Sequence, residues 1–292
     1  MSNPRVPYRW APDRPPLPPL DGARLLVHVV VNVEVWPFDQ PLPRALLSSP
    51  HGARPVPDVP NFSWAEYGMR CGLPRLLQAF GQRAIPVSAS CNAAVIDVYP
   101  RAAEAMLEAG WEFIAHGVEQ RSLVAEDDEA AVIAASLDRL EAFTGTRPRG
   151  WLGPGLAETA ATPDVLRRHG IDHVYDWVLD DLPEWLVADG GPLLALPYSL
   201  ELNDSVLHAV ESYPATELVQ RVRATVDTYE AEITDTVRVL TLPLHPHLLG
   251  VPHRVAAVTE VLDLLAGLPY ARFVTGTRIA DWFRAMEPPP AT

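Results

Sequence analysis

The sequence predicts an α/β fold in which a mostly parallel sheet, with helices outside it, closes into a single barrel. Strand-like and helix-like segments alternate, and about seven strands can be counted between residues 24 and 275. The chain has 292 residues, 48% of them apolar, which is enough for one large core. No G-x-G-x-x-G follows the first strand and no G-x-x-x-x-G-K-[ST] occurs, so a nucleotide-binding fold has no support.

The amino-terminal part predicts an arm followed by the first strand. Residues 1–22 are rich in Pro and Arg and are expected to form an extended polar arm, and residues 23–292 to form one domain. The β-branched stretch ARLLVHVVVNVEV predicts the first strand, which ends near Glu34. A Pro-rich loop is expected from residue 37 to about 60, and a loop of that length is usually functional or interfacial.

The rest of the chain alternates between the two kinds of element. Apolar residues at helical spacing predict helices at 67–83, 99–110, 127–145, 162–170, 215–233 and 253–268. Two of these helices close on Gly110 and Gly145, which are typical carboxyl-terminal stops. Strands are expected at 85–92, 111–117, 149–155, 171–178, 193–199 and 237–247, and the segments RFVTG and RIADWFRAM complete the chain.

Charge and composition restrict the class of partner. The formal net charge of −14 argues against a nucleic-acid or anionic-membrane partner, because neither attracts an acidic surface. No signal-peptide core and no run of 18 apolar residues is present, so a cytoplasmic protein is expected. The arm and the Pro-rich loop suggest contacts between subunits, and we therefore expect a homo-oligomer acting on a small-molecule substrate.

Polar side chains gather where the expected strands end, and in an α/β barrel the active site lies at those ends. The strand-end candidates are Asn32, Glu34, Trp36, Asn92, His116, Trp151, Asp176, Asp180, Asp181, Tyr198, Asn203, His245 and His247. A carboxylate with two or three imidazoles can supply the base, the acid and the oxyanion donors of a hydrolase. Alternation places His245 and His247 on one side of their strand. Structural roles stay open: Glu34 facing outward, Asp176 paired with an arginine, and Trp36 and Trp151 in the core.

Six stretches, in this order, resemble the polysaccharide deacetylase family and, within it, the allantoinase-like branch. They are VVNVEVW, GWEFIAHGVEQ, TGTRPRGWLGPG, DDLPEWL, LPYSLELND and LHPHLLGVPHR, and they span residues 30 to about 254. The resemblance implies a distorted (β/α)7-type barrel with about seven parallel strands. It also implies a hydrolase of a carbon–nitrogen bond other than a peptide bond.

The chain departs from the sugar-deacetylating members of that family at three motifs. Asn32 and Val35 flank Glu34 where the family has an acidic pair, Gln120 replaces the second histidine after His116, and Leu152 stands where a base-orienting arginine is expected. At most two ligands, Glu34 and His116, then remain for a metal, whereas a catalytic zinc site normally has three. No cofactor is therefore expected, and a divalent metal such as zinc is the alternative.

The resemblance favours a hydrolase of a small cyclic amide, imide or ureide that works with little or no metal. In this hypothesis Glu34 is the base, His116 polarises the carbonyl or holds the water, and His245 protonates the leaving nitrogen, with His247 as second candidate. A raised carboxylate pKa at Glu34 would help. The side chains expected to bind substrate are Asn32, Trp36, Asn92, Gln120, Trp151, Asp176 and His247.

Two other functions stay open. One is a metal-dependent N-deacetylase of an acetamido substrate that recruits Glu119, Asp176 or His247 as the missing ligand. The other is a catalytically degenerate barrel that binds a ligand or a partner. The retained Glu34 and His245 argue against the second.

Overall fold

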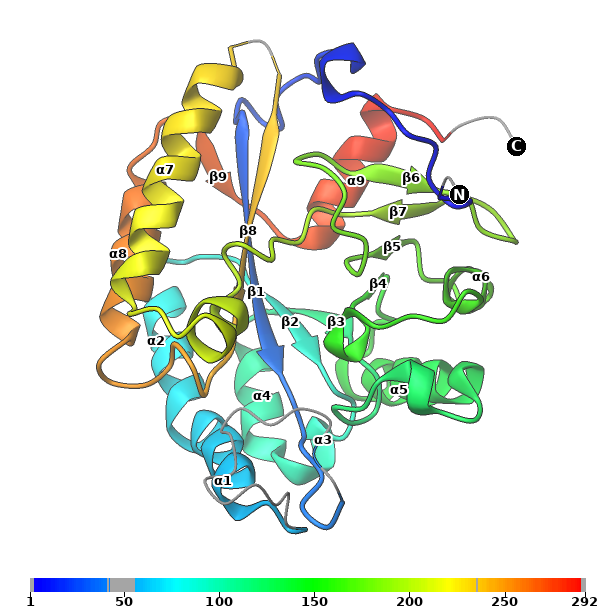
Figure 1. Cartoon of the computed structure of the whole chain (residues 1–292), viewed down its shortest axis with the longest axis vertical. Helices are drawn as coiled ribbons and strands as arrows, with labels where there is room; N and C mark the ends of the chain where they lie inside the picture. The colour runs from blue at the N-terminus through cyan, green and yellow to red at the C-terminus, as the bar shows by residue number, and fades with distance from the viewer. Residues whose placement is uncertain (1–2, 41, 43–55, 235, 290–292) are drawn as a thin grey trace.

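The computed structural model describes residues 3–40, 42, 56–234 and 236–289. Within these residues seven mutually parallel strands lie along the main path of one curled sheet: β1 (Leu25–Val33), β2 (Ser88–Cys91), β3 (Glu112–Ala115), β4 (Gly150–Trp151), β5 (His173–Val174), β7 (Leu193–Ala195) and β8 (Arg238–Leu244). Strand β6 (Glu184–Leu186) pairs antiparallel with β7, and β9 (Ala271–Phe273) pairs parallel with β1. The predicted α/β fold of the distorted (β/α)7 type is confirmed (Figure 1).

The barrel is distorted because its two edges do not form a ladder. The strands follow the order β6-β7-β5-β4-β3-β2-β1-β8, and no strand pairing among the described residues joins β8 to β6 or β7. Single hydrogen bonds cross this seam instead: Val239 N–H donates to the Asp181 carbonyl at 3.0 Å, and Thr241 Oγ1 donates to the Pro197 carbonyl at 2.7 Å. The sheet is therefore curled, but strand pairing among the described residues does not close it into a complete barrel.

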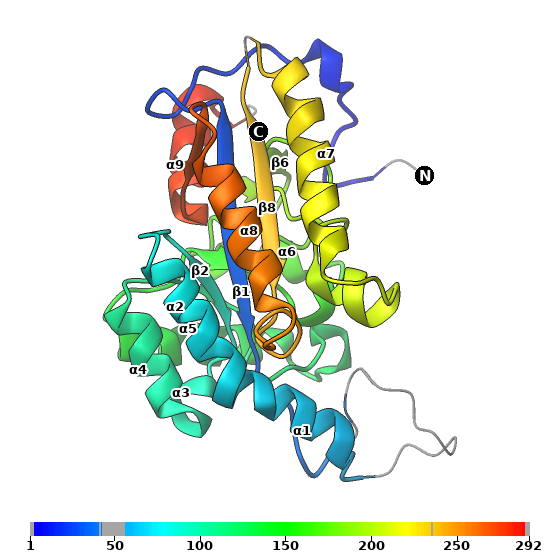
Figure 2. The same ribbon diagram turned by 90° about the vertical axis from the view of Figure 1, so that its left-hand side faces the viewer.

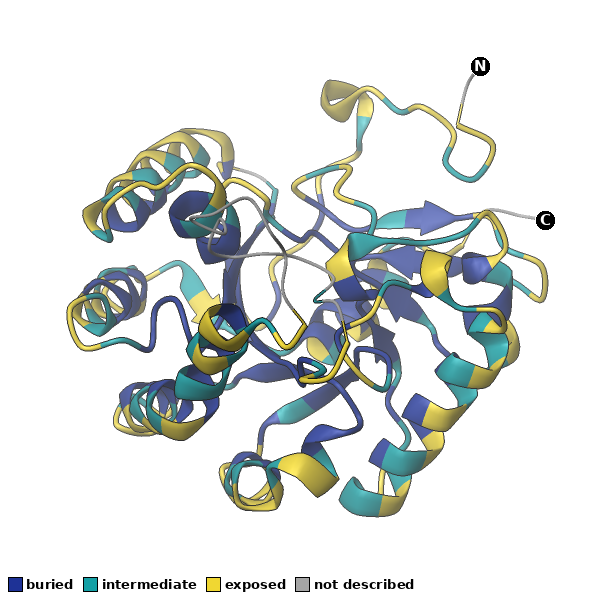
Figure 3. Ribbon diagram, turned by 60° about the horizontal axis from the view of Figure 1, so that its bottom comes forward, coloured by how far each residue is buried: buried dark blue, intermediate teal, exposed yellow. Residues whose placement is uncertain are grey.

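Helices cover the outside of the sheet (Figures 2 and 3). Their apolar faces point inward, as a sheet buried on both faces requires. The α-helices are α1 (Val59–Tyr67), α2 (Leu73–Gly81), α3 (Val95–Val98), α4 (Pro100–Glu108), α5 (Glu129–Thr144), α6 (Thr162–Arg168), α7 (Thr216–Glu232), α8 (Val255–Ala266) and α9 (Gly276–Met286). Shorter helical turns are η1 (Ala11–Asp13), η2 (Gly68–Gly72), η3 (Leu123–Ala125), η4 (Pro154–Leu156) and η5 (Ser205–Val210).

The elements predicted best are those with strong local signals. All nine residues of β1 are buried, which explains why the stretch is rich in β-branched residues. Helix α5 begins at an Asp128 side chain that accepts a hydrogen bond from Ala131 N–H at 3.0 Å. It ends at Gly145, whose φ of 74° places it in the left-handed region that glycine tolerates.

The helix predicted at 67–83 begins earlier, because Asp58 caps α1 by accepting from Asn61 N–H at 3.3 Å. The chain then passes through the π turn η2 into α2. A Cβ on Gly72 would lie 2.0 Å from the Pro246 carbonyl oxygen, so glycine here allows close approach to the end of β8. Most of the loop predicted at 37–60 lies outside the described residues.

The expected arm lies across its own domain, next to β6 and α9 (Figure 1). Arg5 pairs with Asp164 at 2.6 Å, and Arg9 pairs with Glu184 at 3.1 Å and with Glu287 at 2.9 Å. The division into an arm (1–22) and one domain (23–292) stays a prediction. In the part of the chain that the structure covers, no helix has both the length and the apolar character needed to cross a bilayer.

Candidate active site

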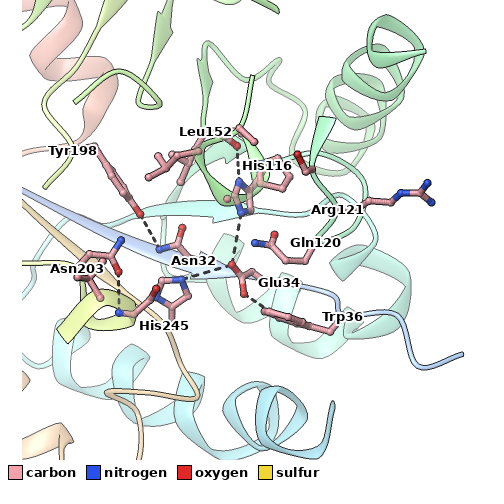
Figure 4. A pocket seen from close by; sticks show the side chains of 18 of the residues that line it. Asn32, Glu34, Trp36, His116, Gln120, Arg121, Leu152, Tyr198, Asn203 and His245 are labelled. Atoms are coloured by element: carbon pink, nitrogen blue, oxygen red, sulfur yellow. Dashed lines mark hydrogen bonds and ion pairs between the residues drawn. The ribbon is translucent and has the colours of Figure 1, made fainter. Parts of the chain in front are cut away.

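A cavity of about 370 Å³ opens at the carboxyl ends of the strands (Figure 4). This is the end of the barrel at which the sequence placed the candidate site. The cavity volume is near the lower limit of ordinary small-molecule pockets. Its lining residues are Asn32, Glu34, Trp36, His116, Gln120, Arg121, Ser122, Leu152, Gly153, Pro154, Gly155, Leu156, Ala157, Tyr198, Leu200, Asn203, Ser205, Val206, His245 and His247.

Strand alternation turns Glu34 into this cavity. Asn32, Glu34 and Trp36 lie on one side of the chain and line the cavity. Val33 and Val35 belong to the hydrophobic core on the other side. Glu34 is 7% exposed, and its Oε2 accepts a hydrogen bond from the indole N–H of Trp36 at 3.0 Å. The open reading in which Glu34 points outward is therefore wrong.

Two imidazoles approach the other oxygen of Glu34. Oε1 of Glu34 lies 3.8 Å from Nε2 of His116 and 3.7 Å from Nε2 of His245. Nδ1 of His116 donates to the Leu152 carbonyl at 2.5 Å, because a carbonyl can only accept. Nε2 of His116 is then the nitrogen that faces the cavity, as a lone pair in the neutral ring and as a donor in the imidazolium.

His245 is oriented by a carboxylate that lies deeper in the protein. Asp204 is fully buried, and its Oδ1 accepts from Nδ1 of His245 at 2.6 Å. Oδ2 of Asp204 accepts from the backbone N–H of His245 at 2.7 Å. This contact fixes the ring and leaves Nε2 toward Glu34, an arrangement suited to moving a proton at that nitrogen.

The pKa of Glu34 is lowered, and is not the raised pKa that would help a base. Burial raises the pKa of this carboxyl, but the imidazole of His116, whose Nε2 lies 3.8 Å away, and the charges of His245 and His247 outweigh burial and lower it to about 2. The apolar surroundings alone would act in the opposite direction. Glu34 is thus a carboxylate at physiological pH.

Of the seven side chains expected to bind substrate, Asn32, Trp36, Gln120 and His247 line the cavity. Asn32 Nδ2 donates to Tyr198 Oη at 3.2 Å, which holds the amide against that wall. The His247 ring makes edge contacts with the rings of Trp36 and His245, at centroid distances of 6.5 and 5.7 Å.

Asn92 and Trp151 do not line the cavity, and this part of the prediction was wrong. The Asn92 side chain accepts from Val35 N–H at 2.9 Å and donates to the His116 carbonyl, so it fastens together the chain segments that carry Glu34 and His116. Trp151 is fully buried in the core, because β4 is paired on both sides at this residue.

Asp176 also lies behind the cavity rather than in it. Its Oδ1 accepts from Gly153 N–H at 2.7 Å and so supports the glycine loop that forms one cavity wall. Burial, reinforced by the charge of Glu158, raises the pKa of Asp176 well above its usual range. The structure thus gives Asp176 a supporting role, and not the arginine pair that the sequence left open.

Asp204 is the main functional candidate that the sequence analysis did not select, and Tyr198 was listed there only as a strand-end candidate without a role. Both belong to the polar stretch PYSLELND, which signals a strand end facing the cavity. The stretch does not show that Asp204 contacts His245, since 41 residues separate the two. Only the fold brings them together.

The residues present do not match the three-ligand set of a catalytic zinc ion. No group of three or more His, Cys, Asp or Glu side chains that could hold a metal ion occurs among the described residues. The neutral amide of Gln120 occupies the place of a histidine, and amide oxygen is a poor zinc ligand. Of the substitute ligands considered, Glu119 is exposed and, like Asp176, is absent from the cavity lining, whereas His247 lines it.

Comparisons with known proteins show what the chain is similar to. The family model of polysaccharide deacetylase matches residues 64–174. A peptidoglycan deacetylase from Helicobacter pylori (strain ATCC 700392 / 26695) is 25% identical over 156 residues, which is 53% of this chain and 53% of that protein. That match therefore spans about half of the curated relative.

Two solved structures match over almost the whole chain. The crystal structure of Puue allantoinase is 26% identical, with a TM-score of 0.85 over 94% of this chain and 96% of that one. The crystal structure of a "probable polysaccharide deacetylase" from Pseudomonas aeruginosa PAO1 is 25% identical, with a TM-score of 0.82 and the same coverage. Both matches thus cover almost the whole of each chain.

Proposed function

The chain belongs to the polysaccharide deacetylase family, and from that premise we propose that it hydrolyses the ring C–N bond of a small cyclic amide, imide or ureide. Members of the family are hydrolases of carbon–nitrogen bonds other than peptide bonds, and this chain is a hydrolase of that class. The ring substrate, and with it the allantoinase-like branch, is our proposal. It is supported by the similarity to an allantoinase and by the small cavity.

One observation carries the proposal. Oε1 of Glu34 lies within 3.8 Å of two imidazole nitrogens, and Gln120, at the place where the family resemblance implies a metal-binding histidine, lines the same cavity. The cavity thus contains a base and an acid but lacks a complete metal set among the described residues. Ring amides can be opened by such acid–base chemistry when the water is well placed.

In the proposed reaction a water lies beside Glu34, which takes its proton as the oxygen attacks the ring carbonyl. His116 holds that water or polarises the carbonyl through Nε2. His245 gives its Nε2 proton to the ring nitrogen as the C–N bond breaks, with Asp204 stabilising the charge of the imidazole. The ring opens to a single product with a new carboxylate and a new N–H.

The pKa of Glu34 is low because of the imidazoles beside it, so the strength of this base depends on their charge. The imidazolium charges beside this carboxylate exist only while the rings are protonated. When His116 is neutral, burial opposes ionisation with less compensation, and Glu34 becomes a stronger base. Turnover should therefore change with pH as the groups beside Glu34 gain and lose protons.

A substrate panel tests the proposal directly. Allantoin, hydantoin, dihydrouracil and succinimide represent the ring substrates, and N-acetylglucosamine oligomers represent the acetamido substrates. We expect ring opening of at least one member of the first group, without acetate release from the second. Acetate release alone would favour the metal-dependent N-deacetylase. The similarity to the Helicobacter pylori peptidoglycan deacetylase supports that alternative. Binding without any turnover would favour the degenerate barrel.

We also propose a homo-oligomer. The arm presents Tyr8 and Trp10 at 84% and 59% exposure, although aromatic side chains of this size are seldom left in water. Sedimentation of the full chain tests this proposal: we expect a mass of two or more chains, and a monomer would refute it.

A further inference from the structure

One side-chain acceptor in the cavity lacks a donor. Gln120 is only 9% exposed, and its Oε1 has no hydrogen-bond partner among the residues that the structure describes. A buried acceptor left unpaired is unfavourable by a factor of about ten or more in an equilibrium constant. Either a water or a ligand must therefore supply the missing donor.

The backbone fixes this amide beside the candidate base. Gln120 N–H donates to the Val35 carbonyl at 2.9 Å, next to Glu34 in the sequence. The turn that brings Gln120 back from His116 passes through Gly117, whose φ is 70°. Figure 4 shows the Gln120 side chain pointing toward Glu34, whereas Arg121 turns outward.

A primary amide offers an acceptor and a donor side by side in one plane. In a ring amide the N–H and the C=O lie on the same side of the C–N bond, so both can pair with such a side chain. An open-chain secondary amide is trans, and its N–H and C=O point in opposite directions. It can satisfy only one of the two groups at a time.

We infer that Gln120 recognises the N–H and C=O edge of a cyclic amide and thereby selects ring amides over open-chain amides. This inference rests on the proposed function and adds the feature by which the substrate is chosen. It assigns the residue that replaces a metal-binding histidine a role as the specificity determinant of this cavity.

Equilibrium binding of three stable probes tests the inference without turnover. The probes are 2-piperidone, its N-methyl derivative, and N-methylacetamide as the open-chain amide. Their Kd values are measured by NMR titration on the full chain, on Gln120→Leu, and on Gln78→Leu. Gln78 is exposed on α2 and provides the same substitution away from the cavity.

We expect 2-piperidone to bind at least about tenfold more tightly than either other probe to the unmodified chain and to Gln78→Leu. In Gln120→Leu this preference should fall below about threefold. An unchanged preference in Gln120→Leu, equal binding of the probes to the unmodified chain, or no binding of 2-piperidone would each overturn the inference. If any of these three results is found and the chain still opens a ring substrate, the inference about Gln120 is refuted and the proposed function stands. If Gln120→Leu loses the preference but the chain opens no ring substrate, the proposed function is refuted and the inference about Gln120 stands.

Discussion

The indole N–H of Trp36 donates to Oε2 of Glu34 at 3.0 Å, which leaves Oε1 to face the two imidazoles. The two oxygens of one carboxylate thus have separate environments. One is held by a neutral donor from the same strand end, and the other faces the groups that can exchange protons. Leu152 stands where the family resemblance implies a base-orienting arginine, and its carbonyl accepts from His116. We therefore propose that Trp36 orients Glu34 instead.

Trp36→Phe should lower kcat on the identified ring substrate by about tenfold, because it deletes a hydrogen bond to a charged group while keeping an aromatic ring. KM should change little. Trp282→Phe is the matched control, since Trp282 donates its indole N–H to the Pro18 carbonyl at 3.1 Å outside the cavity lining. Equal kcat losses in the two variants would show that Trp36 does not orient the base.

Asp204→Asn should lower kcat by about a hundredfold or more, because His245 loses the carboxylate that fixes its ring and stabilises its charge. Asp172→Asn provides the comparison: Oδ1 of Asp172 accepts from Nδ1 of His173 at 2.6 Å, outside the cavity lining. That variant should lose stability, since Asp172 also pairs with Arg149, but should keep the pH profile of turnover. Normal turnover by folded Asp204→Asn would remove His245 as the acid.

The charge of the two imidazoles should control the ionisation of Glu34. Glu34 has a pKa of about 2 in the folded chain, below its ordinary 4.5, so it contributes stability fully present above about pH 4.5 and lost as the pH falls toward 2. The contribution is about 3 kcal/mol in order of magnitude. Carbon-13 NMR titration of labelled glutamate carboxyls, with Glu34→Gln to assign the signal, measures the pKa directly.

In a variant with both His116→Gln and His245→Gln, the pKa of Glu34 should rise above 4.5, because burial then acts with little compensation. A pKa that stays near 2 in this variant would show that other groups hold the carboxylate ionised. The folded state of the variant is checked by its near-ultraviolet circular dichroism.

Metal analysis and chelation test whether the cavity needs a metal ion for turnover. Because the described residues provide no three-ligand group, we expect elemental analysis of protein purified without added metal to show far less than one metal per chain. Turnover of the ring substrate should survive treatment with a strong chelator. A loss of turnover that zinc restores would instead support the metal-dependent N-deacetylase or a site completed by His247.

The parts of the fold that the sequence predicted are those with signals inside one segment. The β-branched run of β1 and the stop of α5 at Gly145 need no knowledge of distant contacts. The π turn at Gly68–Gly72 does, because its close approach to Pro246 exists only once β8 is in place. Strand β6 likewise forms only through its antiparallel pairing with β7.

The site was predictable to the extent that strand ends converge. That rule selected Glu34, His116 and His245 correctly as neighbours, since their strands are parallel and meet at one end. It failed for Trp151, which is the last residue of β4 and is buried in the core. It also failed for Asp176, which follows β5 and supports the Gly153 backbone from behind the cavity. The lowered pKa of Glu34 follows from the placement of the imidazoles, which local sequence does not contain.

The measurement that tests the account most directly is kcat of Glu34→Gln on a ring substrate that the unmodified chain opens. The change keeps the size of the side chain and its acceptor for Trp36, but removes the base. We predict a loss of about a thousandfold or more in a folded variant, as expected when the group that activates the water is deleted. Near-normal turnover by Glu34→Gln would contradict the central claim that Glu34 is the base.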